Sequence, residues 1–225
     1  MNTTDISPKW LAATPFMDYR HPDVAAFVRA AVGDAASNRD KAVRLYYAVR
    51  DRIRYDPYRF SMEPENFRAS HTVQQGAAYC VPKALLYAAG LRSLGIPARP
   101  GFADVKNHLA TERLLKLIGT DLFTWHGYVS LLLDGRWVKA TPVFNIEMCE
   151  RFHVLPLEFD GTRDALMHPY NAHNEKHMEY VCQRGEFDDL PFDEMAADMV
   201  RTYPQLVAMA EGRGGDFEHE AIHEE

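Results

Sequence analysis

The sequence has few cysteines, no long apolar segment and no run of like charges. Its three cysteines, Cys80, Cys149 and Cys182, are odd in number and widely spaced in a chain of 225 residues. A chain of this length needs no disulfides to stabilise its core, so we expect free thiols and a reducing compartment, the cytoplasm. At least one thiol is then available for chemistry.

Two further absences exclude whole classes of protein. No stretch approaches the roughly 18 uninterrupted apolar residues of a membrane-spanning helix, and the N-terminal residues lack the basic and apolar regions of a signal peptide. We therefore expect neither membrane association nor secretion. The formal net charge is −7 and no basic run occurs, which argues against nucleic acid as a partner. No glycine-rich phosphate-binding loop is present, and no cofactor is expected.

Apolar residues make up 47% of the chain, which is enough for one large core. Neither a linker nor an internal repeat divides the sequence, so we expect a single domain over residues 1–212. The acidic end with its glycines, residues 213–225, is expected to be disordered.

Periodicity and turn residues predict an α+β fold. Apolar spacing of three or four, together with helix-end residues, predicts helices over 21–34, 38–57, 81–94, 108–119 and 191–211, the last interrupted near Pro204. Alternation predicts strands over 98–105, 123–133, 136–145 and 156–159. Asp134-Gly135 is the favoured two-residue turn of a hairpin between the second and third of these strands.

Cys80 stands at the start of the helix predicted over 81–94. Unpaired N–H groups and the helix dipole at such an end favour the thiolate, so we expect a lowered pKa and a reactive sulfur. The alternative is an ordinary buried thiol, which is the commoner role of a free cysteine.

A nucleophilic thiol needs a base, and His126 on the first hairpin strand is the candidate. A turn at Asp134-Gly135 would pair His126 with Val143 and would place Thr141 and Asn145 diagonally beside it on the same face. A short polar neighbour could orient the imidazole and complete a catalytic triad. The alternative is a structural histidine.

These residues occur in an order that resembles a known family. GAAYCVPKALLYAAGLRSLGIPARPGF, residues 76–102, is followed by TWHGYVSLLLDGRWVKATPVFN, residues 124–145. Together they resemble the transglutaminase-like superfamily of thiol enzymes, and its bacterial members in particular, over roughly residues 40–145. The resemblance implies a cysteine-proteinase-like, papain-like fold in which a helical N-terminal part, with the nucleophile on a helix, packs on an antiparallel sheet. It also implies a triad of Cys80, His126 and an aspartate.

The aspartate is missing. Fifteen residues after His126, where the family carries it, this sequence has Thr141. A neutral group can still accept the imidazole N–H, so Thr141 is the first candidate for the third member and Asn145 the second. Asp160 or Asp164 could supply a carboxylate from a separate segment, and Asp160 is the third candidate.

Two further sets of polar residues could have a role, one as oxyanion donors and one as metal ligands. The oxyanion formed on attack needs donors, and the candidates are the backbone N–H of Cys80 and the side-chain amide of Gln74 or Gln75. His173 and His177 are four apart and could share a helix face, but without a Cys-x-x-Cys pair this is a weak zinc signal. No metal is expected.

The sequence thus predicts a hydrolase or acyltransferase that attacks an amide or ester carbonyl of a peptide or small molecule through an acyl-cysteine intermediate. One alternative is a binding or scaffold module that keeps the fold without catalysis. Another is proton transfer or addition to a small molecule by the Cys-His pair. The sequence leaves the substrate and the oligomeric state open.

Overall fold

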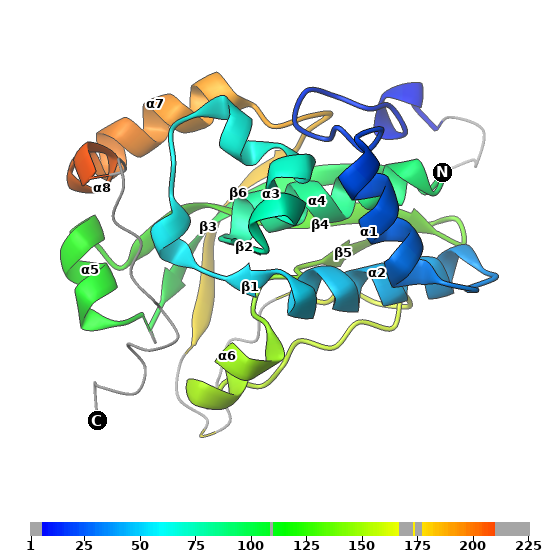
Figure 1. Ribbon diagram of the computed structural model, residues 1–225. Helices are drawn as coiled ribbons and strands as arrows, with labels where there is room; N and C mark the ends of the chain where they lie inside the picture. The colour runs from blue at the N-terminus through cyan, green and yellow to red at the C-terminus, as the bar shows by residue number, and fades with distance from the viewer. Residues whose placement is uncertain (1–5, 109, 167–172, 174–176, 210–225) are drawn as a thin grey trace.

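The structure is a computed structural model that describes residues 6–108, 110–166, 173 and 177–209. Helices from the N-terminal half pack on a four-stranded antiparallel sheet whose strand order is β5, β4, β3, β6 (Figure 1). The α+β class predicted from the sequence is confirmed. The acidic end at 213–225 lies outside the described residues, so the prediction of disorder there is not tested.

The bounds of the elements are as follows. The helices are α1 (Pro22–Val32), α2 (Asn38–Arg52), α3 (Ala69–Gln75), α4 (Cys80–Ser93), α5 (Glu112–Ile118), α6 (Ile146–Arg151), α7 (Phe192–Thr202) and α8 (Pro204–Met209). The strands are β1 (Arg54–Tyr55), β2 (Ala77–Ala78), β3 (Ala98–Asn107), β4 (Leu122–Leu133), β5 (Arg136–Ala140) and β6 (Met178–Glu186). Three short 3-10 helices are η1 (Pro8–Trp10), η2 (Pro57–Arg59) and η3 (Pro64–Phe67).

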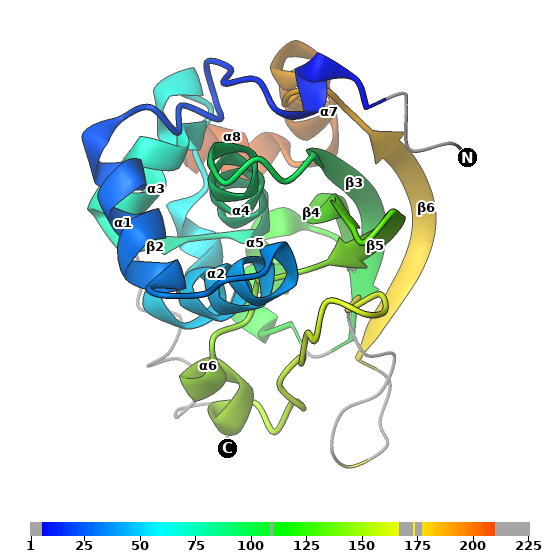
Figure 2. The ribbon, with the colours of Figure 1, turned by 90° about the vertical axis from the view of Figure 1, so that its right-hand side faces the viewer.

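Helix α4 lies at the centre of the fold. Every residue from Val81 to Arg92 is buried, because α4 packs against β4 and β3 on one side and against α1, α2 and α3 on the other. A helix surrounded in this way has apolar residues around its whole circumference rather than along one stripe, with Lys83 and Arg92 buried among them. Figure 2 views α4 nearly end-on, between the other N-terminal helices and the curved sheet.

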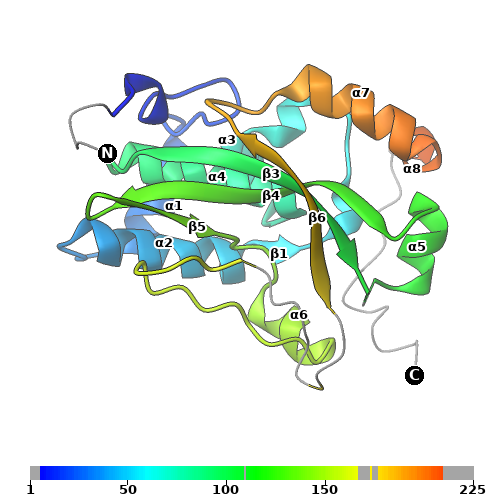
Figure 3. The ribbon, with the colours of Figure 1, turned by 180° about the vertical axis from the view of Figure 1, so that it is seen from behind.

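The core is one continuous cluster of side chains that extends from Met17 to Leu206. It fills the space between the helices α1–α4 and the sheet, and Figure 3 shows the sheet from the side opposite these helices. None of the helices in the described ranges is long and apolar enough to cross a membrane. The single domain over residues 1–212 stays a prediction.

The hairpin turn is confirmed, and it fixes the register of β4 and β5. Asp134 and Gly135 both have positive φ, 49° and 78°, as the favoured two-residue turn requires. Leu133 pairs with Arg136, and the ladder continues as far as Val129 and Ala140.

The predicted pairing of His126 with Val143 is wrong, because the ladder between β4 and β5 ends three residues before His126. After Ala140 the chain turns to another segment, where the N–H of Thr141 donates to the carbonyl of Ala165 at 3.0 Å. The residues after β5 therefore leave the sheet and run toward α2 and α6.

Other predictions differ from the structure in identifiable ways. Helix α2 ends at Arg52 rather than near Pro57, because the next residues form β1, which pairs with β2 just before α4. Residues 156–159 form no strand. Strand β6 and helix α3 were not predicted. Most of β6 is exposed or half-buried, so its sequence lacks the alternation that marks a strand.

Candidate active site

Cys80 is the first residue of α4 and lies directly against β4. A Cβ atom at Gly127 of β4 would stand only 3.1 Å from the carbonyl oxygen of Cys80 and 3.2 Å from the Cα of Val81, so the close approach requires glycine. The N–H of Gly127 also hydrogen-bonds the Cys80 sulfur. The thiol is thereby held beside the residue that follows His126 in the chain.

His126 and Cys80 line the same cavity, which has a volume of about 70 Å³. The imidazole is buried, with 4% of the residue exposed, and its ring makes an edge-on contact with Tyr180 of β6 at 6.3 Å between centroids. The structure therefore brings together the thiol and the imidazole that the sequence predicts as nucleophile and base.

A bulge in the sheet places His126. Trp125, directly before it, has φ of 61°, a conformation that is rare for a bulky side chain. The pairing of β3 with β4 is irregular at this point, and Asp104 of β3 accepts the N–H of Trp125 at 3.1 Å. The local backbone that aims His126 into the cavity is thus held by a buried carboxylate.

The same carboxylate belongs to a wider ion-pair network. Arg184 of β6 donates to Asp104 from Nε at 2.5 Å and from Nη2 at 3.0 Å, and it also bonds Asp198 of α7. The indole N–H of Trp125 donates to Asp198 at 3.0 Å, and the guanidinium lies 4.5 Å from the centroid of the Trp125 ring. One arginine therefore connects β3, α7 and the indole beside His126.

Burial sets the protonation of the pair. Desolvation raises the pKa of the Cys80 thiol to about 11, and the hydrogen bonds from backbone N–H groups only partly oppose this. Desolvation, with the nearby His177, lowers the pKa of His126 to about 4. The expectation that the helix N-terminus lowers the pKa of Cys80 is therefore wrong. At neutral pH the resting pair is a thiol beside a neutral imidazole.

Thr141 is the first candidate for the third member. It is buried, with 1% exposed, and its hydroxyl has no hydrogen-bond partner among the described residues. The Nε2 atom of His126 is likewise buried without a partner in the described parts of the chain. The imidazole thus has one nitrogen for which the described residues supply no orienting group.

A small cavity of about 10 Å³ lies beside Thr141, and His177 and Phe144 also line it. This is close to the minimum space of about 10–15 Å³ that one water molecule needs. From the sequence, His177 was expected only as a weak zinc ligand, and its place near His126 was not predicted. Nothing in the sequence indicates this place, since it depends on where β6 begins.

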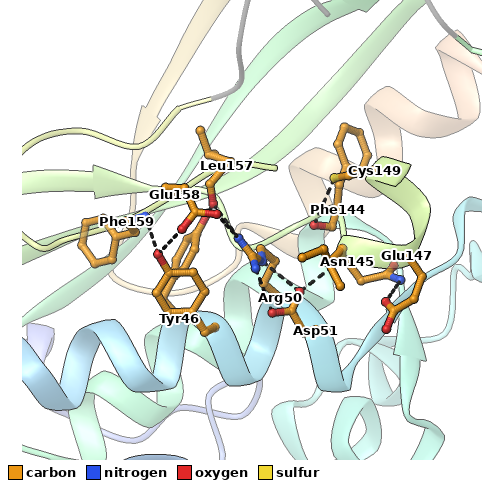
Figure 4. A network of polar contacts seen from close by, with 12 residues as sticks. Tyr46, Arg50, Asp51, Phe144, Asn145, Glu147, Cys149, Leu157, Glu158 and Phe159 are labelled. Atoms are coloured by element: carbon orange, nitrogen blue, oxygen red, sulfur yellow. Dashed lines mark hydrogen bonds and ion pairs between the residues drawn. The ribbon is translucent and has the colours of Figure 1, made fainter. Parts of the chain in front are cut away.

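Asn145 occupies a different position. Its Oδ1 accepts the N–H of Tyr55 in β1 at 2.9 Å, and its Nδ2 donates to Glu147 at the same distance. Figure 4 shows Asn145 above the end of α2, close to Asp51, which accepts the N–H of Ile146 at 3.2 Å. These bonds join the segment after β5 to the helical half of the molecule.

Asp160 cannot serve as the third member. It is exposed, and it accepts hydrogen bonds from the N–H and the hydroxyl of Thr162. The adjacent Gly161 packs against Leu133, at the turn end of β4. His126 is seven residues away along β4, which corresponds to about 23 Å at roughly 3.3 Å per residue. The proposal that Asp160 supplies the missing carboxylate is therefore wrong.

Gln74 and Gln75 lie on the exposed side of α3 and do not line the cavity. The amide of Gln74 donates to Asp23 at 2.8 Å, and Gln75 accepts from Arg59 at 3.0 Å. The structure thus places both amides away from the thiol, so neither is in position to donate to an oxyanion at Cys80. No cluster of three or more potential metal ligands occurs among the residues that the structure describes.

Comparisons with known families, curated proteins and solved structures gave the following results. The family model described as the transglutaminase-like superfamily matches residues 25–142. No match was found among the curated proteins. Among solved structures, the chain is similar to a "Putative Cysteine Protease from Cytophaga hutchinsonii", with 18% sequence identity and a TM-score of 0.49. The match covers 84% of this chain and 48% of that one, so the chain spans about half the length of this neighbour.

The matched region contains Cys80, His126 and Thr141, and it extends over more than half of the 225 residues. The resemblance noted in the sequence is thereby confirmed. The chain belongs to the transglutaminase-like superfamily.

Proposed function

We propose that this protein is a cysteine-dependent acyl-transfer enzyme or hydrolase, with Cys80 as nucleophile and His126 as its base. The observation that carries the proposal is that the thiol and the imidazole line one cavity, with the sulfur at the first residue of a buried helix. Superfamily membership supports a cysteine-based enzyme in general terms, and the description of the solved neighbour agrees with it.

The proposed reaction has two steps. In the first, the Cys80 sulfur forms a bond to an amide or ester carbonyl, while His126 takes the thiol proton and gives it to the leaving amine or alcohol. In the second, His126 removes a proton from water or an amine, which attacks the acyl-cysteine and releases the free thiol. The donor proposed for the negative oxygen formed in each step is the backbone N–H of Cys80 at the start of α4.

The neutral resting pair determines how the proton moves. A buried imidazole whose pKa is about 4 is unprotonated at neutral pH and can therefore accept the thiol proton. The transfer creates two opposite charges next to each other, and their attraction offsets part of the desolvation that keeps each group neutral at rest. We assign Thr141 as the group that orients His126 through a bound water, because its hydroxyl and the Nε2 atom of His126 are both buried without a partner among the described residues.

The substrate would be a peptide or a small amide or ester. The three cysteines are all unbridged, which fits work in a reducing compartment such as the cytoplasm. Acceptance of water or of an amine in the second step decides between hydrolase and acyltransferase.

The test is intact-mass analysis after exposure to activated acyl esters, with the modified residue located by peptide mapping. We expect an adduct on Cys80 whose mass equals the acyl group, none in Cys80→Ala, and slow formation in His126→Asn. Cys149 is buried, so Cys149→Ala is the matched control and should acylate as the wild type does. Acylation of Cys182 alone, which is exposed, would overturn the proposal.

A second candidate is a binding module that keeps the fold without catalysis. The raised pKa of Cys80 and the unpartnered Nε2 of His126 favour it, because neither is expected of a site that stores a thiolate. The Cys80→Ala variant separates the two functions. In a binding module this variant keeps its ligand affinity and has no turnover to lose, whereas in an enzyme it keeps substrate binding and loses turnover.

A further inference from the structure

The cavity beside Cys80 and His126 has an apolar wall. Strand β3, the start of β4 and the helices α5, α7 and α8 supply most of it. The apolar side chains of this wall include Val105, Leu114, Ile118, Phe123, Met199 and Leu206. Among the described residues that line the cavity, none is an aspartate, glutamate, lysine or arginine. A charged group entering the cavity would therefore lose its water without gaining an ion pair.

Most hydroxyl groups of this wall are already bonded within the protein. Thr124 donates to the hydroxyl of Tyr203 at 3.2 Å, and Tyr203 donates to the carbonyl of Leu122 at 2.8 Å. The exception is Tyr79, whose phenol oxygen is buried without a hydrogen-bond partner among the described residues. Burial raises the pKa of Tyr79 well above its usual value, so its O–H stays available as a donor.

We propose that this cavity binds the acyl group of the substrate, and that the group is short, uncharged and apolar. The inference rests on the proposed acyl-cysteine chemistry. A cavity of about 70 Å³ has roughly half the volume of the 150 Å³ apolar cavity that holds a benzene molecule. It therefore has room for an acyl chain of about three or four carbon atoms.

The one polar atom of such a group fits the Tyr79 O–H, a donor that has no partner among the described residues of the wall. An acyl chain presents apolar surface to the wall and a carbonyl oxygen to the end that holds Cys80. The Tyr79 O–H donates to that oxygen, and it continues to do so when attack by sulfur converts the carbonyl into an oxyanion. Tyr79 directly precedes Cys80, so the donor and the nucleophile are adjacent in the chain.

The step balances without any further reactant. The Cys80 sulfur forms a bond to the carbonyl carbon, the bond to the leaving oxygen breaks, and the thiol proton passes through His126 to that oxygen. Water or an amine later attacks the thioester, His126 takes the proton of the attacking group and passes it to the sulfur, and the bond between the acyl carbon and the sulfur breaks. Tyr79 keeps its proton throughout and contributes only a hydrogen bond.

The experiment measures single-turnover acylation of Cys80 by p-nitrophenyl esters of acetate, butyrate, hexanoate, decanoate and succinate. We expect the rate to rise about fourfold for each added methylene up to a chain of about four carbons, as burial of a methylene in an apolar site predicts. Hexanoate and decanoate should react more slowly than butyrate. The charged succinate should react at least ten times more slowly than butyrate, which has the same number of carbons.

Two variants of α5 make the test specific to the cavity. Ile118→Ala enlarges the cavity and should shift the optimum toward hexanoate, whereas Leu115→Ala, on the same helix but outside the lining, should leave it unchanged. Tyr79→Phe removes the donor and should slow every ester by about tenfold or more without changing the preferred length.

Failure of this inference differs from failure of the proposed function. If no ester acylates Cys80, the proposed function fails, and the inference with it. If all five esters acylate Cys80 at similar rates, or succinate reacts best, the function stands and the apolar cavity is not the acyl site. Binding of butyramide and succinamate to Cys80→Ala, followed by NMR, adds a readout without chemistry. Equal affinity for the two would overturn the inference.

Discussion

At the scale of residues, the site consists of two groups that burial keeps neutral. A thiol with a pKa of about 11 beside an imidazole with a pKa of about 4 holds no charge at neutral pH. Such a pair differs from a stored thiolate, because the proton moves only when a substrate is bound. The Nε2 atom of His126, which has no partner among the residues that the structure describes, marks the place where an acid would stabilise the charged form.

Restoring the acid should change the protonation of His126. A carboxylate near the imidazole favours its charged form, so Thr141→Asp should raise the pKa of His126 by about 1 unit or more. An imidazolium would in turn stabilise the thiolate. We expect alkylation of Cys80 by iodoacetamide at pH 7 to become about tenfold faster. NMR titration of the imidazole and the alkylation rate measure the two effects.

The matched control for this change is Thr141→Asn, which has the same shape as the aspartate but no charge. It should leave the pKa of His126 and the alkylation rate close to those of the wild type. Identical behaviour of the aspartate and asparagine variants would show that position 141 does not act on His126.

At the scale of elements, a buried lysine joins α4 to the end of α2. The Nζ atom of Lys83 donates to the carbonyl of Arg50 at 2.9 Å and also to that of Ile53. Carbonyls at the end of a helix lack intrahelical donors, so this side chain satisfies them. Burial lowers the pKa of Lys83 to about 7, even though Asp51 favours its charged form.

This lowered pKa makes stability depend on pH. Between about pH 7 and 10 the unfolded chain holds a proton at Lys83 that the folded chain has lost, so the contribution of Lys83 to the free energy of unfolding rises with pH. We expect the difference in unfolding free energy between the wild type and Lys83→Met to increase by roughly 2 kcal/mol from pH 7 to pH 9. Urea denaturation at the two pH values measures it.

The exposed Lys116 of α5 provides the comparison for this effect. The difference between the wild type and Lys116→Met should stay constant from pH 7 to pH 9. A constant difference for Lys83→Met as well would mean that Lys83 is not held in the buried position that the structure gives it.

The bulge at Asp104 is the second element that the site depends on. Asp104→Ala leaves the N–H of Trp125 and one side of Arg184 without their partner, and loss of a buried charge partner costs about 3 kcal/mol of stability. We expect this loss in urea denaturation, together with slower acylation of Cys80, because His126 follows Trp125. Asp121→Ala, which removes an exposed carboxylate paired with Lys106, should leave both the stability and the acylation rate close to those of the wild type.

At the scale of the whole molecule, the elements that carry the site were largely predictable. The helix that begins at Cys80 and the hairpin turn at Asp134-Gly135 have strong local signals, namely a proline in the first turn and a two-residue turn. Superfamily order then indicated Cys80 and His126 as a pair. These features depend on patterns within short segments, so they can be predicted from the sequence.

The features of the site that the sequence did not predict depend on contacts between distant segments. The bulge at Trp125 is held by Asp104 and Asp198, which lie 21 and 73 residues away in the sequence. The end of the ladder at Ala140 is set by Ala165, and the raised pKa of Cys80 reflects how deeply the assembled fold buries the sulfur. A helix N-terminus lowers a thiol pKa only where water or a counter-charge remains, and no local pattern reports that.

The central claim is that His126 takes the proton from the Cys80 thiol during acylation. The pH dependence of single-turnover acylation by p-nitrophenyl butyrate, compared between the wild type and His126→Asn, tests it most directly. For the wild type we expect the rate to rise through about pH 4, where the imidazole loses its proton, and to stay level across the neutral range. His126→Asn should be at least about 100-fold slower at pH 7 and should speed up about tenfold per pH unit, because only the thiolate then reacts. Equal rates and equal profiles for the two proteins would contradict the account.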